Sequence, residues 1–513
     1  MQLGLPMQEM TLFEFAGHTL DLQQGRLRNG DGDVALRRKS LALLTYLVQH
    51  SGRVLAKDEL VAAIWPDVAV SDDSLAQCMK DIRKALGAEG TGFIRTLPRR
   101  GYIVDDIRIN ALGDERAATN PSVAVLPFTV MSNDPGQEFF ADGLVEDILT
   151  TLSKLSGLSV IARDSSFAYK SRNIDLHQIA HELGVRFILE GSVQKSGDRL
   201  RVTVQLVDVV SETQVWAERF DRSVNDLFAV QDEITLTLAT EMQVKLTEGE
   251  QARLRYTTTT NVDAWNLWIE GLNHSRGSHG MDFHVQACRC WEKALTHDPN
   301  SAPLLGMLAF RYFSDARHGW TEATRETSLL KSEAYVQRTL AIDADNPDAH
   351  RAKSGILLLR SEFEEASIAA RKAVKHGPSM ADVLAFSAFV LASCGRAVEA
   401  IGHAEKAIAL SPKHPAWYFG VLGNAYRLAG RRDAALKALR GYHVREPGFG
   451  LGDIIIIQDQ MGSKKEAHAT AQQLTMLRPT FTITSYTKTQ FRSDSAQLEM
   501  DIASLRASGI VEE

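Results

Sequence analysis

Residues 71–87, SDDSLAQCMKDIRKALG, decide the fold of the first part of this chain. The segment opens with Ser and Asp residues that can cap the start of a helix, and it ends at a glycine that can terminate one. Apolar residues recur at helical spacing and predict one buried stripe, formed by Leu75, Met79, Ile82 and Leu86. The opposite face is polar and carries Ser74, Gln77, Lys80, Asp81 and Lys84.

The sequence on both sides of this helix predicts a small α+β domain. Residues 12–36 alternate apolar and polar residues around turn signals such as NGDG, which is typical of an antiparallel sheet. Two short amphipathic helices follow, with apolar stripes at Leu41, Leu44, Leu47 and Val48 and at Leu60, Ile64 and Trp65. After the third helix, FIRTLPRRGYIV (93–104) predicts two strands whose connecting turn carries Arg99 and Arg100.

This order of sheet, three helices and hairpin resembles the winged-helix DNA-binding domain of OmpR/PhoB-type regulators, over residues 12–107. The resemblance implies that the polar face of the third helix lies in the major groove of double-stranded DNA and that Arg99 and Arg100 contact phosphate or a minor groove. Asp81 on that face could equally repel phosphate. Only eleven residues precede the first predicted strand, so we expect no receiver domain and no phosphorelay on this chain. Winged helices of this kind often bind tandem half-sites, so self-association on DNA is expected.

A second domain is expected over residues 121–257, after a small, polar linker at 108–120. SVAVLPF and LSVIA predict strands, FFADGLVEDILTTLSKL and DLHQIAHELGV predict helices, and this alternation indicates an α/β sheet. The segment resembles the TolB-like domain found beside CadC-type regulators and class III adenylate cyclases. Its polar residues Asp142, Glu146, Arg163, Asp164 and His177 lack nucleophile, metal or phosphate-loop spacing, so we interpret them as caps and surface charges.

Residues 262–480 are self-similar and helical. Their units close at Pro299, Ala344, Pro378, Pro412, Pro447 and Pro479, which gives a period near 34 residues with one insertion near 311–325. The small residues, aromatics and closing prolines resemble tetratricopeptide repeats, which stack into an all-α superhelix with an inner groove. In the repeat that closes at Pro447, we expect Trp417, Asn424 and Arg427 to face that groove and contact a protein or peptide, although Trp417 could simply pack between repeats. Residues 481–513 predict a capping helix.

Composition narrows the class of protein. The N-terminus lacks a secretory pattern and the longest apolar windows are shorter than a membrane span, so we expect a cytoplasmic protein without a membrane anchor. Four cysteines with no CxxC pair and no Cys/His cluster of zinc-site spacing predict reduced thiols and no metal site. The net charge of −7 lies outside residues 1–110, which hold 14 basic and 14 acidic residues. No cofactor is expected.

The leading hypothesis is a transcriptional regulator that binds DNA through residues 12–107, while the other domains sense a cytoplasmic signal or recruit a partner. The domain order resembles that of CadC- and HilA-type activators, without the membrane helix of the CadC-like members. A tetratricopeptide interaction scaffold that has lost DNA contact is the alternative. An enzyme that acts on nucleotides, by analogy with the cyclases, has only fold-level support, so we expect no catalytic residues.

Overall fold

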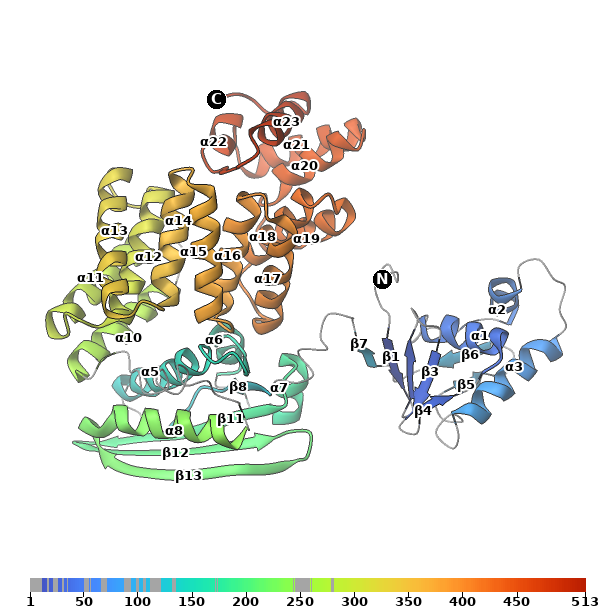
Figure 1. Ribbon diagram of the computed structural model, residues 1–513, viewed down its shortest axis with the longest axis horizontal. Helices are drawn as coiled ribbons and strands as arrows, with labels where there is room; N and C mark the ends of the chain where they lie inside the picture. Colours follow the sequence, from blue (N-terminus) through green and yellow to red (C-terminus); the bar gives the residue numbers. More distant parts are fainter. Residues whose placement is uncertain are drawn as a thin grey trace. The chain divides into compact units, whose positions relative to one another are not determined.

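The computed structural model describes residues 12–15, 18–21, 26–29, 32–34, 36–49, 55, 57–65, 72–86, 94–97, 101–104, 108–110, 121–131, 135–170, 172, 174–242, 244, 259, 261–277 and 281–513. The chain divides into two compact units, Met1–Thr119 and Asn120–Glu513 (Figure 1). The predicted multidomain class, with a winged helix, an α/β domain and a helical repeat array, is confirmed. Within the described residues, no helix is both long and apolar enough to span a membrane.

The first unit is a sheet followed by three helices and a hairpin. Its sheet has the strand order β4-β3-β2-β1-β7, and β5 and β6 form the separate antiparallel hairpin. Tyr102 in β6 exchanges two backbone hydrogen bonds with Leu55, which ties the hairpin to the segment before α2. The elements are β1 (Leu12–Phe15), β2 (His18–Asp21), β3 (Arg26–Asn29), β4 (Gly32–Val34), α1 (Arg38–Gln49), α2 (Lys57–Ile64), α3 (Asp72–Ala85), β5 (Ile94–Leu97), β6 (Gly101–Val104) and β7 (Arg108–Asn110).

Two features of this unit refine the sequence analysis. The stripe predicted for the third helix is buried in full and packs in one core with residues of α1, α2, β5 and β6. Residues 108–110, which the sequence pattern places in the linker, form β7 and pair antiparallel with β1, so the sheet extends to Asn110. A strand of three residues has too few positions to show the period of two that identifies a strand in sequence.

The second unit begins with a mixed sheet of order β10-β8-β11-β12-β13, with β9 paired to β11. β8 pairs in parallel with β10 and β11, whereas β11, β12 and β13 form antiparallel ladders. α5 and α8 share one core with the sheet, and α7 packs in a second core with β8 and β11. The elements are β8 (Ser122–Val125), β9 (Thr129–Val130), α5 (Pro135–Leu152), β10 (Ser159–Val160), α6 (Arg163–Phe167), α7 (Leu176–Leu183), β11 (Phe187–Ser196), β12 (Arg199–Asp208), β13 (Thr213–Ser223), η1 (Val224–Asp226) and α8 (Leu227–Glu241).

Helical hairpins follow and stack side by side in chain order (Figure 1). The insertion expected near 311–325 lengthens both helices of one hairpin, because α12 and α13 have 17 and 18 residues and most later repeat helices have 12 to 14. The helices are α10 (Val262–Gly277), α11 (Met281–His297), α12 (Ala302–His318), α13 (Arg325–Ile342), α14 (Pro347–Leu359), α15 (Phe363–His376), α16 (Ala381–Ser393), α17 (Ala397–Leu410), α18 (Trp417–Leu428), α19 (Arg432–Arg445), α20 (Leu451–Gln460) and α21 (Lys464–Leu477).

The α/β domain and the first repeat share one hydrophobic core. Gly143 of α5 lets α10 approach closely, because a Cβ at that position would lie 2.6 Å from atoms of both Trp265 and Ile269. The buried Trp265 indole donates a hydrogen bond to Asp147 of α5 over 2.6 Å. The sequence predicts two separate domains at 121–257 and 262–480, but the structure joins them into a single compact unit.

A second seam joins the α/β domain to repeats much later in the sequence. The backbone N–H of Ala162 donates to Leu410 O over 2.7 Å, and the Ser379 hydroxyl donates to Leu158 O over 2.7 Å. Ser165 lies against Ser411, with the two hydroxyl oxygens 3.2 Å apart. The array therefore lies against the α/β domain at its first hairpin and again near α16 to α18.

The chain ends in two helices where the sequence predicts one: α22 (Ile483–Thr487) and α23 (Ser495–Ala507). Thr482 and Ser485 form a reciprocal capping box at the start of α22. Leu505 and Ile510 are buried against α20 and α21, so this segment covers the end of the array as a cap.

Candidate nucleic-acid interface and repeat groove

The predicted recognition helix is α3, and its polar face is accessible. Gln77, Lys80 and Lys84 are exposed and Ser74 is half-buried, whereas the apolar stripe on the other side of the helix is buried. Amides and hydroxyls can contact base edges, and ammonium groups can contact phosphates. The structure therefore brings these four predicted residues together on one face of a firmly packed helix.

Asp81 is directed back toward its own domain. The buried Ser40 hydroxyl of α1 donates to Asp81 Oδ2 over 3.3 Å, and Arg37 lies 3.7 Å from the same oxygen. Gln77 donates to Asp81 Oδ1 over 3.0 Å. Asp81 thus orients Gln77 and ties α3 to α1, which gives the carboxylate a positioning role that the sequence analysis did not assign.

Arg83 is a basic residue that the sequence analysis missed. Its Nη2 donates to Ile94 O and to Thr96 Oγ1, both over 2.8 Å, and so joins α3 to β5 of the hairpin. No sequence pattern distinguishes it, because a basic residue near a helix C-terminus is ordinary in surface helices. The Arg83 side chain therefore holds the hairpin of β5 and β6 in place against α3.

The predicted phosphate contacts Arg99 and Arg100 lie outside the described residues. They connect β5 to β6, whose pairing runs from Ile94 with Val104 to Leu97 with Gly101. Gly101 has a φ of 123°, which residues with a side chain rarely adopt. The backbone conformation at the start of β6 therefore favours glycine at position 101.

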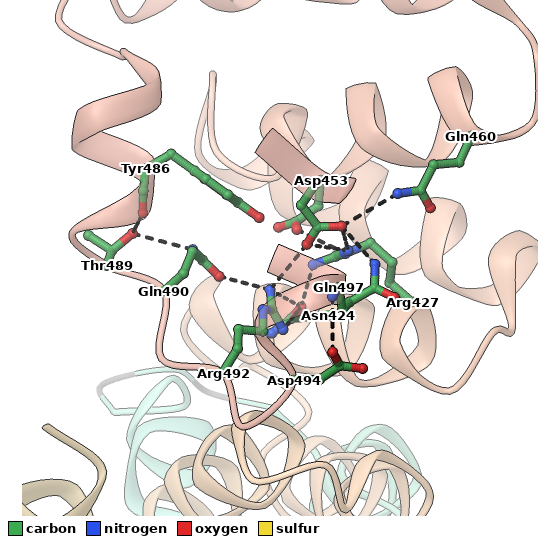
Figure 2. Close-up of polar contacts among 11 residues, drawn as sticks. Asn424, Arg427, Asp453, Gln460, Tyr486, Thr489, Gln490, Arg492, Asp494 and Gln497 are labelled. Atoms are coloured by element: carbon green, nitrogen blue, oxygen red, sulfur yellow. Dashed lines mark hydrogen bonds and ion pairs between the residues drawn. The ribbon is translucent and has the colours of Figure 1, made fainter. Parts of the chain in front are cut away.

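The three residues predicted for the repeat groove occupy α18, where the chain's own C-terminal segment contacts two of them (Figure 2). Arg427 Nη1 donates to both carboxylate oxygens of Asp501 over 2.9 Å, and its Nε lies 3.1 Å from Asp453. Asn424 Oδ1 accepts from Arg492 over 3.4 Å and from Arg427 over 3.3 Å. These contacts, rather than open solvent, surround the polar face of α18.

This network is a buried, balanced cluster of two arginines and two aspartates. The side chains of Arg427, Arg492 and Asp501 are at most 4% exposed. Burial disfavours the charge, but Asp453 and Asp501 raise the pKa of Arg427. Arg427 is therefore an internal ion-pair partner in this conformation, which differs from the open ligand contact that the sequence predicts. No sequence spacing connects Arg427 to Asp501, because the two residues lie 74 positions apart.

Trp417 packs among its neighbours. Its ring makes an edge contact with Tyr418 at a centroid distance of 4.5 Å, and it lies against two apolar clusters of the repeats. The half-buried indole matches the alternative interpretation of this residue, packing between repeats.

Several polar residues of the α/β domain pair with one another. Arg163 Nε lies 3.0 Å from Glu146, and Lys170 lies 2.8 Å from both Asp142 and Glu138. These ion pairs join α5 to α6 and to the residues that follow α6. Glu146 is buried, and the Arg163 and Asp142 side chains are at most 16% exposed, so these three residues are internal ion-pair partners rather than the surface charges that the sequence predicts.

Two family models match the chain. Residues 31–104 match the family described as "Transcriptional regulatory protein, C terminal", and residues 118–237 match "HilA/YgeH-like transcriptional regulator, second domain". The first match covers the first unit from β4 to β6, and the second covers the α/β domain from β8 into α8.

Three relatives are similar to this chain. The transcriptional regulator HilA of Salmonella typhi is 21% identical over 88% of this chain and 80% of its own length. The transcriptional activator CadC of Escherichia coli is 35% identical over 15% of each chain. A protein of Rhizobium meliloti named "Putative adenylate cyclase 3" is 38% identical over 48% of this chain, and the match spans 42% of that relative.

These findings confirm the resemblance stated from the motifs. The first unit is an OmpR/PhoB-type winged-helix domain, and the α/β domain is of the kind found in HilA-like regulators. The chain thus combines two domain types of transcriptional regulators, matched by these two family models, with a helical repeat array at its C-terminal end.

Proposed function

We propose that this chain is a sequence-specific transcriptional regulator that places α3 in the major groove of double-stranded DNA. The observation that carries the proposal is the exposed face of α3, with Gln77, Lys80 and Lys84, in a domain that matches a family of DNA-binding regulators. Lys80 and Lys84 would contact phosphates, while Ser74 and Gln77 would contact base edges.

Arg99 and Arg100 are proposed as further contacts on the resemblance alone. Guanidinium groups at the tip of a hairpin can bind phosphate or enter a narrow minor groove. Two copies would bind half-sites about one helical turn apart, as winged helices of this type commonly do. A complex with one chain per natural site would contradict the proposed self-association.

We assign residues 120–513 the task of receiving a cytoplasmic signal or binding a protein partner. Support comes from the HilA match, which extends over most of the chain, and from the continuous core of the α/β domain and the repeats. A partner reaches Asn424 and Arg427 only by displacing the C-terminal segment that contacts them. The proposal assigns the chain no catalytic step, since both family matches are to transcriptional regulators.

The test is binding of the full chain to genomic DNA fragments across a salt series. We compare the wild type with Lys80→Ala/Lys84→Ala and with the matched control Lys437→Ala/Lys465→Ala, which removes two exposed lysines from the repeats. The wild type and the control should select the same fragments. The α3 variant should bind more weakly, and the slope of log K against log salt should fall by about one for each phosphate that the variant no longer contacts.

Two outcomes would reject the proposal. If the wild type selects no fragment, the chain is better described as an interaction scaffold that uses its repeats. If the α3 variant and the control bind alike, DNA contact does not depend on α3.

A further inference from the structure

Three side chains of the first repeat hairpin bring different metal-ligand atoms together. Glu270 and His274 lie one helical turn apart on α10, and Cys290 lies on α11. The Glu270 carboxylate oxygen, the imidazole nitrogen and Cys290 Sγ all lie within 4.8 Å of one another. Within the part of the chain that the structure describes, this is the one group of three such residues.

The packing of the hairpin explains why the two helices meet at this point. Trp291, next to Cys290 in the chain, is fully buried and donates its indole N–H to Trp268 O over 3.0 Å. Gly271, next to Glu270, leaves room for that indole, because a Cβ at Gly271 would lie 2.2 Å from Trp291 Nε1. The backbone that carries the three ligands is therefore held in place by a buried tryptophan contact.

The donor set suits a borderline transition metal better than a hard cation. Zn²⁺ binds Cys sulfur at about 2.3 Å, His nitrogen at about 2.0 Å and carboxylate oxygen at about 2.1 Å, so neighbouring ligands of a tetrahedral ion lie roughly 3.3–3.7 Å apart. His274 Nε2 and Glu270 Oε1 are 3.9 Å apart, and the Glu270 side chain is exposed and can rotate. Each pair of ligand atoms therefore needs to approach by no more than about 1.5 Å to reach this geometry.

We propose that Glu270, His274 and Cys290 form a site for a divalent transition metal, Zn²⁺ being the expected ion, with three protein ligands and one open position. The site goes beyond the proposed function and does not depend on DNA binding. A cysteine binds a metal ion as the thiolate, so the metal must displace the thiol proton of Cys290. Binding should consequently strengthen as the pH rises.

The ion would act at the junction of the second unit. α10 carries Trp265, which packs against α5 of the α/β domain, and the proposed ion would cross-link α10 to α11. A ligand that binds only the folded state stabilises it by mass action. Metal binding should therefore raise the thermal unfolding midpoint of the second unit.

The experiment titrates the metal-free full chain with Co²⁺ and records its absorption spectrum, because a thiolate bound to Co²⁺ gives a near-ultraviolet charge-transfer band. We expect one Co²⁺ per chain, displacement of Co²⁺ by Zn²⁺, and loss of the band in Cys290→Ser. The matched control is Cys288→Ser, which removes the buried cysteine two residues earlier in the same helix and should keep the band. His274→Gln keeps the thiol and should weaken binding by about tenfold or more.

Circular dichroism shows whether each variant is folded, and His274→Gln tests the site should Cys290→Ser fail to fold. The proposal is overturned if the wild type shows no charge-transfer band. It is also overturned if the band survives in Cys290→Ser, or if His274→Gln binds Co²⁺ as tightly as the wild type.

Discussion

Trp265 in the first repeat helix donates its indole N–H to Asp147 in the α/β domain over 2.6 Å, and Gln231 donates to the same carboxylate oxygen over 2.7 Å. Asp147 and Trp265 are both buried. One carboxylate therefore joins α5, α8 and α10, three helices from two sequence regions that the sequence pattern predicts to be separate domains.

Trp265→Phe should destabilise the whole second unit. The substitution keeps most of the apolar contact but removes one donor from a buried carboxylate, which costs about 1–3 kcal/mol. Hydrogen exchange should show lower protection in both α5 and α10, and calorimetry should show a lower unfolding midpoint. Trp320→Phe is the control, because the ring contacts of that tryptophan are with His284 and His318 of the repeats. A change confined to the repeats would argue against the joint core.

Two substitutions of Asp81 separate the effect of its negative charge on DNA binding from the effect of its hydrogen bonds on stability. Asp81→Asn removes the negative charge but keeps an oxygen that accepts from Ser40 or Gln77, so DNA affinity should rise several-fold at low salt with little change in stability. Asp81→Ala also leaves the buried Ser40 hydroxyl without this acceptor and should cost about 1 kcal/mol. Equal DNA affinity for wild type and Asp81→Asn would show that the negative charge of Asp81 does not weaken DNA binding.

The buried ion pair of Arg427 and Asp501 should be more costly to break than to replace. Asp501→Ala leaves Arg427 with Asp453 and removes the acidic partner of Arg492, so it should destabilise the C-terminal repeats by about 3–5 kcal/mol. The double variant Arg427→Met/Asp501→Leu restores the charge balance and should be more stable than Asp501→Ala alone. Denaturant unfolding followed by circular dichroism measures both. A single substitution that costs under about 1 kcal/mol would contradict the assigned burial.

Acid should weaken the second unit partly through His414. Burial lowers the pKa of this imidazole, Arg445 lowers it further, and the hydrogen bond to Pro415 O opposes them. As the pH falls below about 6.5, the imidazole therefore becomes protonated in the unfolded state before it does so in the folded state. The contribution of His414 to the free energy of unfolding is constant above that pH and falls as the pH drops toward the pKa of the folded state. His414→Gln should flatten the slope of stability between about pH 6.5 and 5.

Local sequence patterns predicted most helices and strands of this chain, but they did not predict the contacts between residues far apart in the sequence. The stripe of α3 follows from helical periodicity, since Leu75, Met79, Ile82 and Leu86 are all buried as expected. The contact between Asp147 and Trp265 joins residues 118 positions apart, and periodicity carries no information on such pairs.

The candidate sites divide in the same way. Gln77, Lys80 and Lys84 were predictable because an exposed helix face follows directly from its buried face. Arg427 was not, because its environment depends on Asp501 in the C-terminal helix. Cys290 and His274 lack zinc-site spacing in sequence for a similar reason, as they come from two helices that Gly271 and Trp291 hold together.

The core that joins the α/β domain to the repeats limits how this chain can be recombined. A crossover placed between α8 and α10 would separate Trp265 from Asp147 and expose the apolar surfaces that both segments bury. A crossover between Thr119 and Asn120 cuts no described strand or helix and leaves both compact units whole. Exchange of DNA specificity between relatives, in nature or in an engineered chimera, should therefore transfer the winged helix alone and inherit the remaining residues as one block.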